Sequence, residues 1–533
     1  MKETKILKRR DMKNKIFALG AGLMMLTAWS CREESDVLMT YDHDDALVFN
    51  TAKNSFADKF QLMWDGMNQY YTLWDYEAEN GLDWDAIYDE YYPQFAALDQ
   101  RGENETVTDD ELMTLMGKVL GQLHDGHFHF DMMNHKTGSK VMCFPLKDKN
   151  AKRADFTQTA SFRPNLTYFA DPANNEIETD ANGNPIYMEY STNMLDVLGP
   201  FFNTPGIGYQ WIEAKIQELE ALTNPTEMQA FQLLQLKELY PALTQFKANP
   251  NNISLYNSLQ SKYSFLNVPG FNYFEPGFAQ EGIRFMYALL KGNIAYFHVS
   301  GFSMSYYLNE EYSNALFNMS NPDTKNHVEK MKQVWQAWYD AVQQLHKAGT
   351  LKGVIIDVRN NQGGLVDDYQ YCVGALLPEG GLQIGYHRAK RGYGRYDYSM
   401  MMPAVVKTMS GSHEVIDDIP VVLLANCFTV SMGEMSTLGV KIMPNGTVVG
   451  KRTWGGLCPL AGNSYNSFNY SGHIGVDGVT PVYGYVPILA LFSLDKKVLE
   501  GHGIEPDIEV EYNPASSADV QLLQALSVIR NGK

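Results

Sequence analysis

Two stretches in the second half of the chain decide its fold: GVIIDVRNNQGG at residues 353–364 and VVLLANCFTVSMGE at residues 421–434. Each begins as a short apolar run rich in β-branched residues and stops at small and polar residues. This pattern is typical of a buried strand that ends at a functional loop. The first loop offers two adjacent glycines, and the second offers Ser431 where a strand is expected to turn into a helix. A nucleophile beside backbone N–H groups that can hold an oxyanion is what acyl transfer requires.

Strand and helix patterns alternate around these two stretches from residue 282 to residue 533. Strands are expected at 294–299 and 447–450, and helices at 326–347, 367–377, 433–442 and 516–530. Such alternation predicts an α/β fold with a mainly parallel sheet covered by helices.

The first half of the chain has different patterns. Residues 43–135 show apolar residues at helical spacing, with a capping pattern at Thr108, and predict a helical bundle. Residues 136–281 mix turn-rich segments with a helical stretch at 209–246 that Pro225 and Pro241 should break or kink. They predict a mixed α+β middle insertion without an evident catalytic or binding motif.

The N-terminus has the composition of an export signal. A lysine- and arginine-rich start is followed by an apolar stretch at 16–29 that is short for a membrane span. Ala28-Trp29-Ser30-Cys31 resembles a bacterial lipobox, so residues 1–31 are expected to be a signal peptide and Cys31 the lipid attachment site. Residues 32–42 would be a charged tether. A bacterial cell-envelope protein that touches the membrane only through this lipid is expected; a secreted protein with an incidental cysteine is the alternative.

The net charge and the cysteine and histidine positions limit which ligands and partners we expect for this protein. The formal net charge of −19 argues against nucleic acid. The cysteines beyond Cys31 are widely spaced, and a disulfide between Cys143 and Cys458 is possible in an exported protein. The spacing of His124, His127 and His129 does not match a known zinc site. We therefore expect neither a metal nor a cofactor.

Six segments, in order, resemble the tail-specific or C-terminal processing serine peptidase family, which includes the tricorn core protease. They cover the end of the helical domain and most of the second half of the chain. The resemblance implies a crotonase-like (ClpP-like) peptidase core. The matching segments are Leu123–His127, Asn293–Phe302, Ile356–Gly364, Asn426–Glu434, Val449–Gly456 and Glu500–Asp507.

The resemblance also implies roles for individual residues. Ser431 would be the nucleophile, and backbone N–H groups of Gly364 and Met432 would form the oxyanion hole. The processing proteases carry a lysine base after the Thr-Phe-Gly turn, but that position here is Gly456. The tricorn-like branch instead uses a histidine and a downstream glutamate, for which His127 and Glu500 are the best matches.

Less specific interpretations compete with these roles. Ser431 and Glu434 could form only a helix capping box, and Glu434 is expected to be structural in either case. His127 could simply satisfy a helix C-terminus. We expect a serine endopeptidase that acts on a peptide or protein substrate. The alternatives are a catalytically inactive binding protein on the same scaffold and a Ser–Lys peptidase that uses Lys451 as its base.

Overall fold

The computed structural model describes residues 54–532, with gaps at 103–104, 155–175, 192–207, most of 249–282, 317–318, 320–321, 393, 459–460, 463–468, 471, 476–479, 514–515 and 517. The predicted signal peptide, Cys31 and the tether lie outside the described residues. Among the helices that are described, none combines the length and apolar character needed to cross a membrane.

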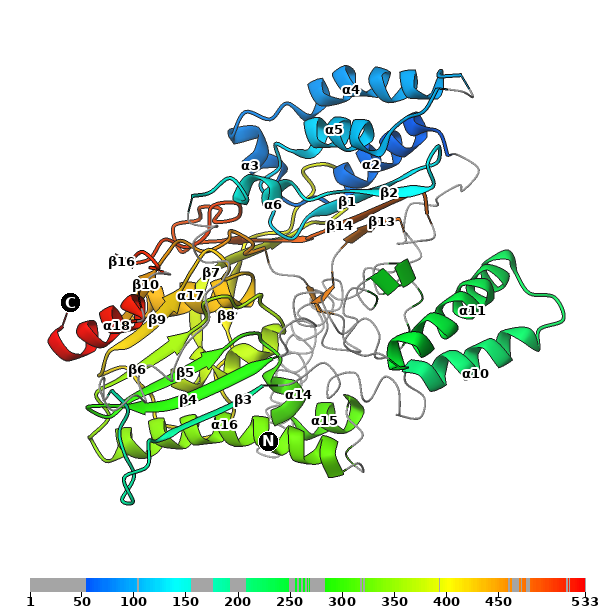
Figure 1. The fold of residues 1–533 in the computed structure, drawn as a ribbon. Helices are drawn as coiled ribbons and strands as arrows, with labels where there is room; N and C mark the ends of the chain where they lie inside the picture. Colours follow the sequence, from blue (N-terminus) through cyan, green and yellow to red (C-terminus); the bar gives the residue numbers. More distant parts are fainter. Residues whose placement is uncertain are drawn as a thin grey trace, which may run out of the picture.

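A seven-stranded sheet forms the centre of the second half of the chain (Figure 1). The five strands from β16 to β5 are parallel, and β4 and β3 add antiparallel pairs at one edge. The predicted, mainly parallel sheet is therefore present. Its strands, in spatial order, are β16 (Ile508–Glu509), β10 (Gly446–Gly450), β9 (Val421–Ala425), β6 (Gly353–Asp357), β5 (Ile294–Val299), β4 (Arg284–Leu290) and β3 (Tyr187–Ser191).

Helices cover both faces of this sheet, which explains why its central strands are apolar throughout. One face packs against α16 (Pro322–Lys347) and α17 (Met432–Ile442), and the other packs against α18 (Val520–Asn531). The short helices α14 (Met304–Leu308) and α15 (Glu310–Leu316) lie beside α16.

The helix expected at 367–377 is instead a pair of 3₁₀ turns, η3 (Val366–Tyr371) and η4 (Val373–Leu376). They are separated at Cys372, whose backbone leaves the helical region with φ −118° and ψ −103°.

The first helices pack on a second sheet. The sheet has the order β13 (Gly472–Ile474), β14 (Val482–Val486), β1 (His129–Asn134) and β2 (Ser139–Cys143). Apolar residues of both layers share one core, so the predicted bundle is in fact a helical layer on a sheet. The layer consists of α2 (Phe56–Tyr70), α3 (Trp74–Glu79), α4 (Trp84–Asp99) and α5 (Asp109–Leu120), and Thr108 caps α5 as expected.

The expected domain boundary at residues 135 and 136 falls inside a hairpin, because β1 pairs with β2. The middle insertion is also not one unit. Strand β3 joins the central sheet, and α6 (Pro145–Asn150) follows β2. Helices α10 (Gly208–Glu220) and α11 (Glu227–Ala248) form a hairpin with its own apolar cluster, apart from the two large sheets in Figure 1. The helical stretch is interrupted near Pro225, between α10 and α11, but α11 continues through Pro241.

Two small sheets complete the described structure. The three-stranded sheet has the order β15 (Leu489–Phe492), β7 (Leu382–Ala389) and β8 (Met402–Val406), and the two-stranded sheet pairs β11 (Ala461–Gly462) with β12 (Asn469–Tyr470).

Candidate active site

Ser431 lies at the turn between β9 and α17, as the sequence predicts. Its backbone has φ 54° and ψ −116°, a conformation that costs a residue with a Cβ atom free energy and is found mainly at functional sites. The Val430 carbonyl accepts the Gly433 N–H at 2.9 Å, which closes the turn. Met432 begins the helix, where a backbone N–H has no intrahelical acceptor and can face an anion.

The glycine loop after β6 lies directly against this turn. A Cβ atom on Gly363 would be 2.6 Å from Ser431 Cβ and 3.2 Å from the Met432 nitrogen. Gly363 and Gly364 have φ of 92° and 136°. A Cβ atom on Gly364 would lie 2.1 Å from the Phe302 carbonyl oxygen, so both positions require glycine. The structure thus brings the predicted loop and the predicted nucleophile together, with Gly363 as the residue against Ser431.

Glu434 connects the nucleophile turn to the turn at 453–456. Its side chain is fully buried. Oε1 accepts hydrogen bonds from the Thr453 hydroxyl and the Gly455 N–H, and Oε2 accepts them from the N–H groups of Gly456 and Ser431. Burial raises the pKa of Glu434 to about 7, against the opposing effect of these hydrogen bonds. The contacts agree with the structural role expected for this residue.

His127 begins the approach to β1 and lies beside Gly456. A Cβ atom on Gly456 would be 3.6 Å from His127 Cε1 and 3.5 Å from Cγ1 of Val430, the residue before Ser431. The histidine ring therefore adjoins the position at which the processing proteases are expected to carry lysine. Burial lowers the pKa of His127 to about 4, so the imidazole is neutral near pH 7, as a base must be.

His127 and Ser431 have no mutual hydrogen bond in the described structure, and His127 Nδ1 is buried without a partner there. Hydrogen bonds between catalytic groups are often loose before substrate binds and tighten afterwards. These contacts place the His127 ring beside Gly456, but no hydrogen bond to Nδ1 fixes the orientation of the ring.

Glu500 lies at the site, where its carboxyl oxygens accept hydrogen bonds from backbone N–H groups. The side chain is fully buried. Oε1 accepts the Gly126 N–H at 2.6 Å, and Oε2 accepts the N–H groups of Leu457 and Cys458. No hydrogen bond between Glu500 and the His127 ring is present among the described residues. The direct orienting contact expected from the sequence is therefore not seen, and Glu500 instead ties the residue before His127 to the segment after Gly456.

Asp125 is a site residue that the sequence analysis missed. It is fully buried, and Oδ1 accepts the backbone N–H groups of His127 at 2.9 Å and Phe128 at 3.0 Å. An aspartate two residues before the histidine is a common sign of such a turn. A carboxylate oxygen of Asp125, a carboxylate oxygen of Glu500 and Cys458 Sγ lie within 4.8 Å of one another. Burial raises the pKa of Asp125 to about 7, and burial and Asp125 raise that of Glu500 well above its usual range.

These three side chains do not make a convincing metal site. Both Glu500 oxygens already accept backbone N–H groups, and no fourth ligand joins the group in the part of the chain described. Cys143 and Cys458 are both buried free thiols, so the disulfide considered from the sequence is absent. Their burial in the core of the N-terminal layer and its sheet accounts for them without a bridge.

Lys451 forms ion pairs with two glutamates, Glu509 and Glu511. Its ammonium group lies 2.6 Å from Glu509 and 2.5 Å from Glu511. Burial lowers the lysine's pKa, but hydrogen bonds to the two glutamates outweigh it and raise the pKa overall. A lysine held protonated by two carboxylates is a poor general base.

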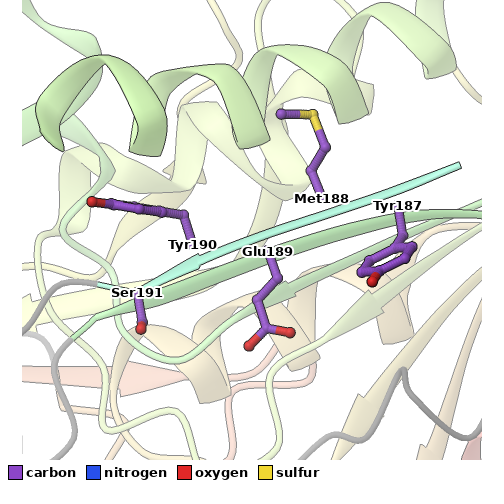
Figure 2. Close-up of a pocket in the computed structure, with 5 residues that line it drawn as sticks. All are labelled: Tyr187, Met188, Glu189, Tyr190 and Ser191. Carbon is purple, nitrogen blue, oxygen red and sulfur yellow. The ribbon is translucent and has the colours of Figure 1, made fainter. Parts of the chain in front are cut away.

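A separate hollow lies on the edge strand β3 (Figure 2). It has a volume of about 630 Å³ and is lined by Tyr187–Ser191. In Figure 2, Met188 and Tyr190 point toward one side of the strand, and Tyr187 and Glu189 toward the other. Since β3 lies four strands from β9, the hollow is roughly 19 Å across the sheet from the nucleophile strand.

A strained serine at a strand-to-helix turn, beside a glycine loop and near a neutral histidine, is an arrangement that acyl-transfer hydrolases use. Residues 293–510 match the model of peptidase family S41. The resemblance to the C-terminal processing serine peptidase family is thereby confirmed, and the match supports a serine peptidase. It includes Gly364, Ser431 and Glu500, while His127 lies before it.

Related proteins point the same way. The chain is 26% identical over 183 residues to the tricorn protease of Thermoplasma volcanium, covering 33% of this chain and 14% of that protein. It is 24% identical over 194 residues to a CtpA-like serine protease of Staphylococcus aureus, covering 36% and 32%. The chain therefore spans less than a third of either relative.

Two solved structures are similar at low identity. The mature CPAF complex with lactacystin is 11% identical with a TM-score of 0.39, covering 90% of this chain and 95% of that one. The photosystem II D1 C-terminal processing protease is 18% identical with a TM-score of 0.26, covering 45% and 47%. At these TM-scores neither likeness carries an argument about the site.

Proposed function

We propose that this protein is a serine endopeptidase that cleaves peptide or protein substrates through an acyl-enzyme at Ser431. The observation that carries the proposal is the packing of Gly363 against Ser431 at a strained helix start. This packing gathers a nucleophile and the first backbone N–H groups of α17 at one point. In this mechanism Ser431 Oγ attacks the scissile carbonyl carbon and forms a tetrahedral intermediate. The N–H groups of Gly364 and Met432 hold its oxyanion.

His127 acts as the general base and then the general acid. It accepts the Ser431 proton as the carbon–oxygen bond forms and gives that proton to the leaving amine as the carbon–nitrogen bond breaks. Water then attacks the acyl-enzyme, and His127 takes its proton before returning one to Ser431. The low pKa of His127 and the adjacency of its ring to Gly456 support this role. Glu500 acts by fixing the backbone on both sides of this ring.

A fluorophosphonate probe tests the proposal, because it reacts with activated serines. The chain lacking residues 1–31 is expected to be labelled, and labelling should be lost in Ser431→Ala and in His127→Ala. Lys451→Gln is the matched control for the base and should still be labelled. Labelling that survives His127→Ala but not Lys451→Gln would assign the base to Lys451. Absence of labelling in the folded wild type would favour a binding protein.

We also propose that Cys31 carries lipid and anchors the protein to the bacterial cell envelope. The proposal is supported by the lipobox-like Ala28-Trp29-Ser30-Cys31 after a basic and apolar start. Expression of the full chain with a radiolabelled fatty acid should label the wild type but not Cys31→Ser. Equal labelling of both proteins would contradict the proposal.

A further inference from the structure

The turn that carries His127 contains two buried polar atoms without partners in the described structure. They are Asp125 Oδ2 and His127 Nδ1. Buried polar atoms of this kind are uncommon because each costs free energy, and they call for an explanation. Asp125 Oδ1 accepts the backbone N–H of His127, so both atoms belong to the ends of one hydrogen-bonded turn.

Asp125 and Glu500 differ in how they are held. Both oxygens of Glu500 accept hydrogen bonds from three backbone N–H groups, so the surrounding backbone fixes the position of its carboxyl group. Asp125 receives hydrogen bonds on Oδ1 only, and Oδ2 receives none among the described residues. Asp125 can therefore lose or gain a proton on Oδ2 without breaking a backbone hydrogen bond. Oxygens of the two buried carboxyl groups lie within 4.8 Å of each other, so the two groups do not both ionise readily and the pair keeps at least one proton.

The other titratable groups around the pair are already engaged. Glu77 on α3 accepts hydrogen bonds from the Tyr71 hydroxyl and from His124. The remaining neighbours are the Cys458 thiol, Glu434 on α17, Tyr76 on α3 and Lys149 on α6; Lys149 donates to the carbonyls of Gln122 and Leu123. None of these contacts supplies a counter-charge to the His127 ring.

We propose that Asp125 and Glu500 form a buried acid pair that is neutral while both carboxyl groups are protonated, and that loss of one proton, from Asp125, supplies the negative charge that balances the His127 imidazolium. Asp125 is thus a positioning residue for the proposed reaction, on which this inference depends. When His127 takes the Ser431 proton its ring becomes cationic, and an ionised pair stabilises that cation strongly at low dielectric. A pair that still holds both protons is neutral and provides little such stabilisation.

The proposal predicts an unusual pH dependence. The rise of activity with pH should follow ionisation of the pair, near the Asp125 pKa of about 7, because the pKa of His127 itself is about 4. An ordinary serine–histidine site would show that rise as the titration of its histidine.

The first test measures the second-order rate of fluorophosphonate labelling from pH 5 to pH 9. Asp125→Asn keeps an oxygen that can accept the N–H groups of His127 and Phe128 but cannot ionise. The wild-type rate should rise near pH 7, whereas the variant should lack this rise and be at least about tenfold slower at pH 8. Asp131→Asn is the control, since Asp131 is also buried but pairs with Lys140. It should keep the wild-type profile. A variant that retains the rise, or that slows equally at every pH, overturns the proposal.

A second test does not depend on activity or on folding of the Asp125 variant. In ¹⁵N-histidine-labelled Ser431→Ala protein, the His127 ring signal can be assigned by its loss in a Ser431→Ala/His127→Gln protein. It should shift near pH 7 as the pair ionises, in addition to its own titration near pH 4. A signal that does not move between pH 6 and pH 8 overturns the acid pair. If wild-type labelling fails but this shift is seen, the proposed peptidase fails and the acid pair stands.

Discussion

Glu434 Oε2 accepts the backbone N–H of Ser431 at 3.2 Å, and the same oxygen accepts the N–H of Gly456 at 2.7 Å. One buried carboxylate thus holds the nucleophile turn and the turn beside His127 in a fixed relation. This contact explains how residues from two sequence segments more than 300 positions apart can form one site. The His127 ring lies beside Gly456, and the N–H groups of Gly456 and Ser431 donate to the same Glu434 oxygen.

Replacing Glu434 with glutamine should therefore damage both stability and the site. A glutamine amide nitrogen in place of one oxygen would leave two donors without an acceptor, either the N–H groups of Ser431 and Gly456 or the Gly455 N–H and the Thr453 hydroxyl. At about 1–3 kcal/mol for each orphaned donor, Glu434→Gln should lose about 2 kcal/mol or more of unfolding free energy. Its melting temperature and its fluorophosphonate labelling should both fall. Glu505→Gln is the control, because the Glu505 side chain is 56% exposed and should be nearly neutral.

Gly363→Ala should abolish most of the activity, because the new methyl group would lie 2.6 Å from Ser431 Cβ. The displacement of the nucleophile or the oxyanion donors should cost about 10²-fold or more in labelling rate. Gly411→Ala separates this collision from backbone strain. Gly411 has φ 94°, close to the 92° of Gly363, and nothing lies within 4 Å of its Cβ position. If both variants lose labelling equally, strain and not contact with Ser431 explains the effect.

The strand ends and the position of Ser431 at a strand-to-helix turn could be predicted because local patterns encode them. The apolar runs before Gly363 and Ser431 end where β6 and β9 end, to within a residue for β9. Ser431 and Gly364 were singled out because their segments stand in order among six that resemble one family, since Ser431 taken alone is equally explained as a helix cap. Lys451 illustrates the limit, since its two glutamate partners come from β16 and the residues after it and decide its protonation.

The acids behind the site could not be placed in the same way. Glu500 and its donor Gly126 are 374 positions apart, and its other donors are backbone groups with no sequence signature. Asp125 has a local signature, but its unpartnered oxygen is visible only in the fold. The N-terminal boundary was misplaced for a related reason. Strand β14, which pairs with β1 in the sheet under the N-terminal helices, lies more than 300 positions further along the chain.

Asp368 should make the protein less stable as the pH rises. It is fully buried in η3, where Oδ1 accepts hydrogen bonds from Ser305 and Oδ2 has no partner in the described structure. Burial raises the pKa of Asp368 to about 7, above its value near 4 in an unfolded chain. The folded state therefore holds this proton where the unfolded state does not. Its contribution is fully present below about pH 4 and is lost progressively as the pH rises to about 7.

Asp368→Asn removes this titration and keeps an acceptor for Ser305. The difference in melting temperature between variant and wild type should therefore shift in favour of the variant from pH 5 to pH 8, by an amount corresponding to about 1–3 kcal/mol. Comparing the two proteins at each pH cancels the opposite contributions of His127 and His298, whose pKa values burial lowers to about 4. Parallel melting temperatures across this range would show that Asp368 is ionised throughout.

Position 456 offers a test of how the site could exchange one base for another. Gly456 has no positive φ, and a Cβ atom there would make only ordinary contacts of 3.5–3.6 Å with Trp454, Val430 and His127. Gly456→Ala should therefore label within about threefold of wild type. Gly455→Ala should not, because Gly455 has φ 104° and its Cβ atom would lie 2.9 Å from the Gly501 backbone.

In the absence of the His127 ring, a longer side chain at position 456 gains the space that the imidazole occupied. The double variant His127→Ala/Gly456→Lys should therefore regain part of the fluorophosphonate labelling that His127→Ala loses. A lysine amine in this partly desolvated turn can take the Ser431 proton in place of the imidazole. His127→Ala/Gly456→Met is the control that fills the same space without a base. Equal labelling of the lysine and methionine variants would mean that position 456 does not reach the Ser431 proton.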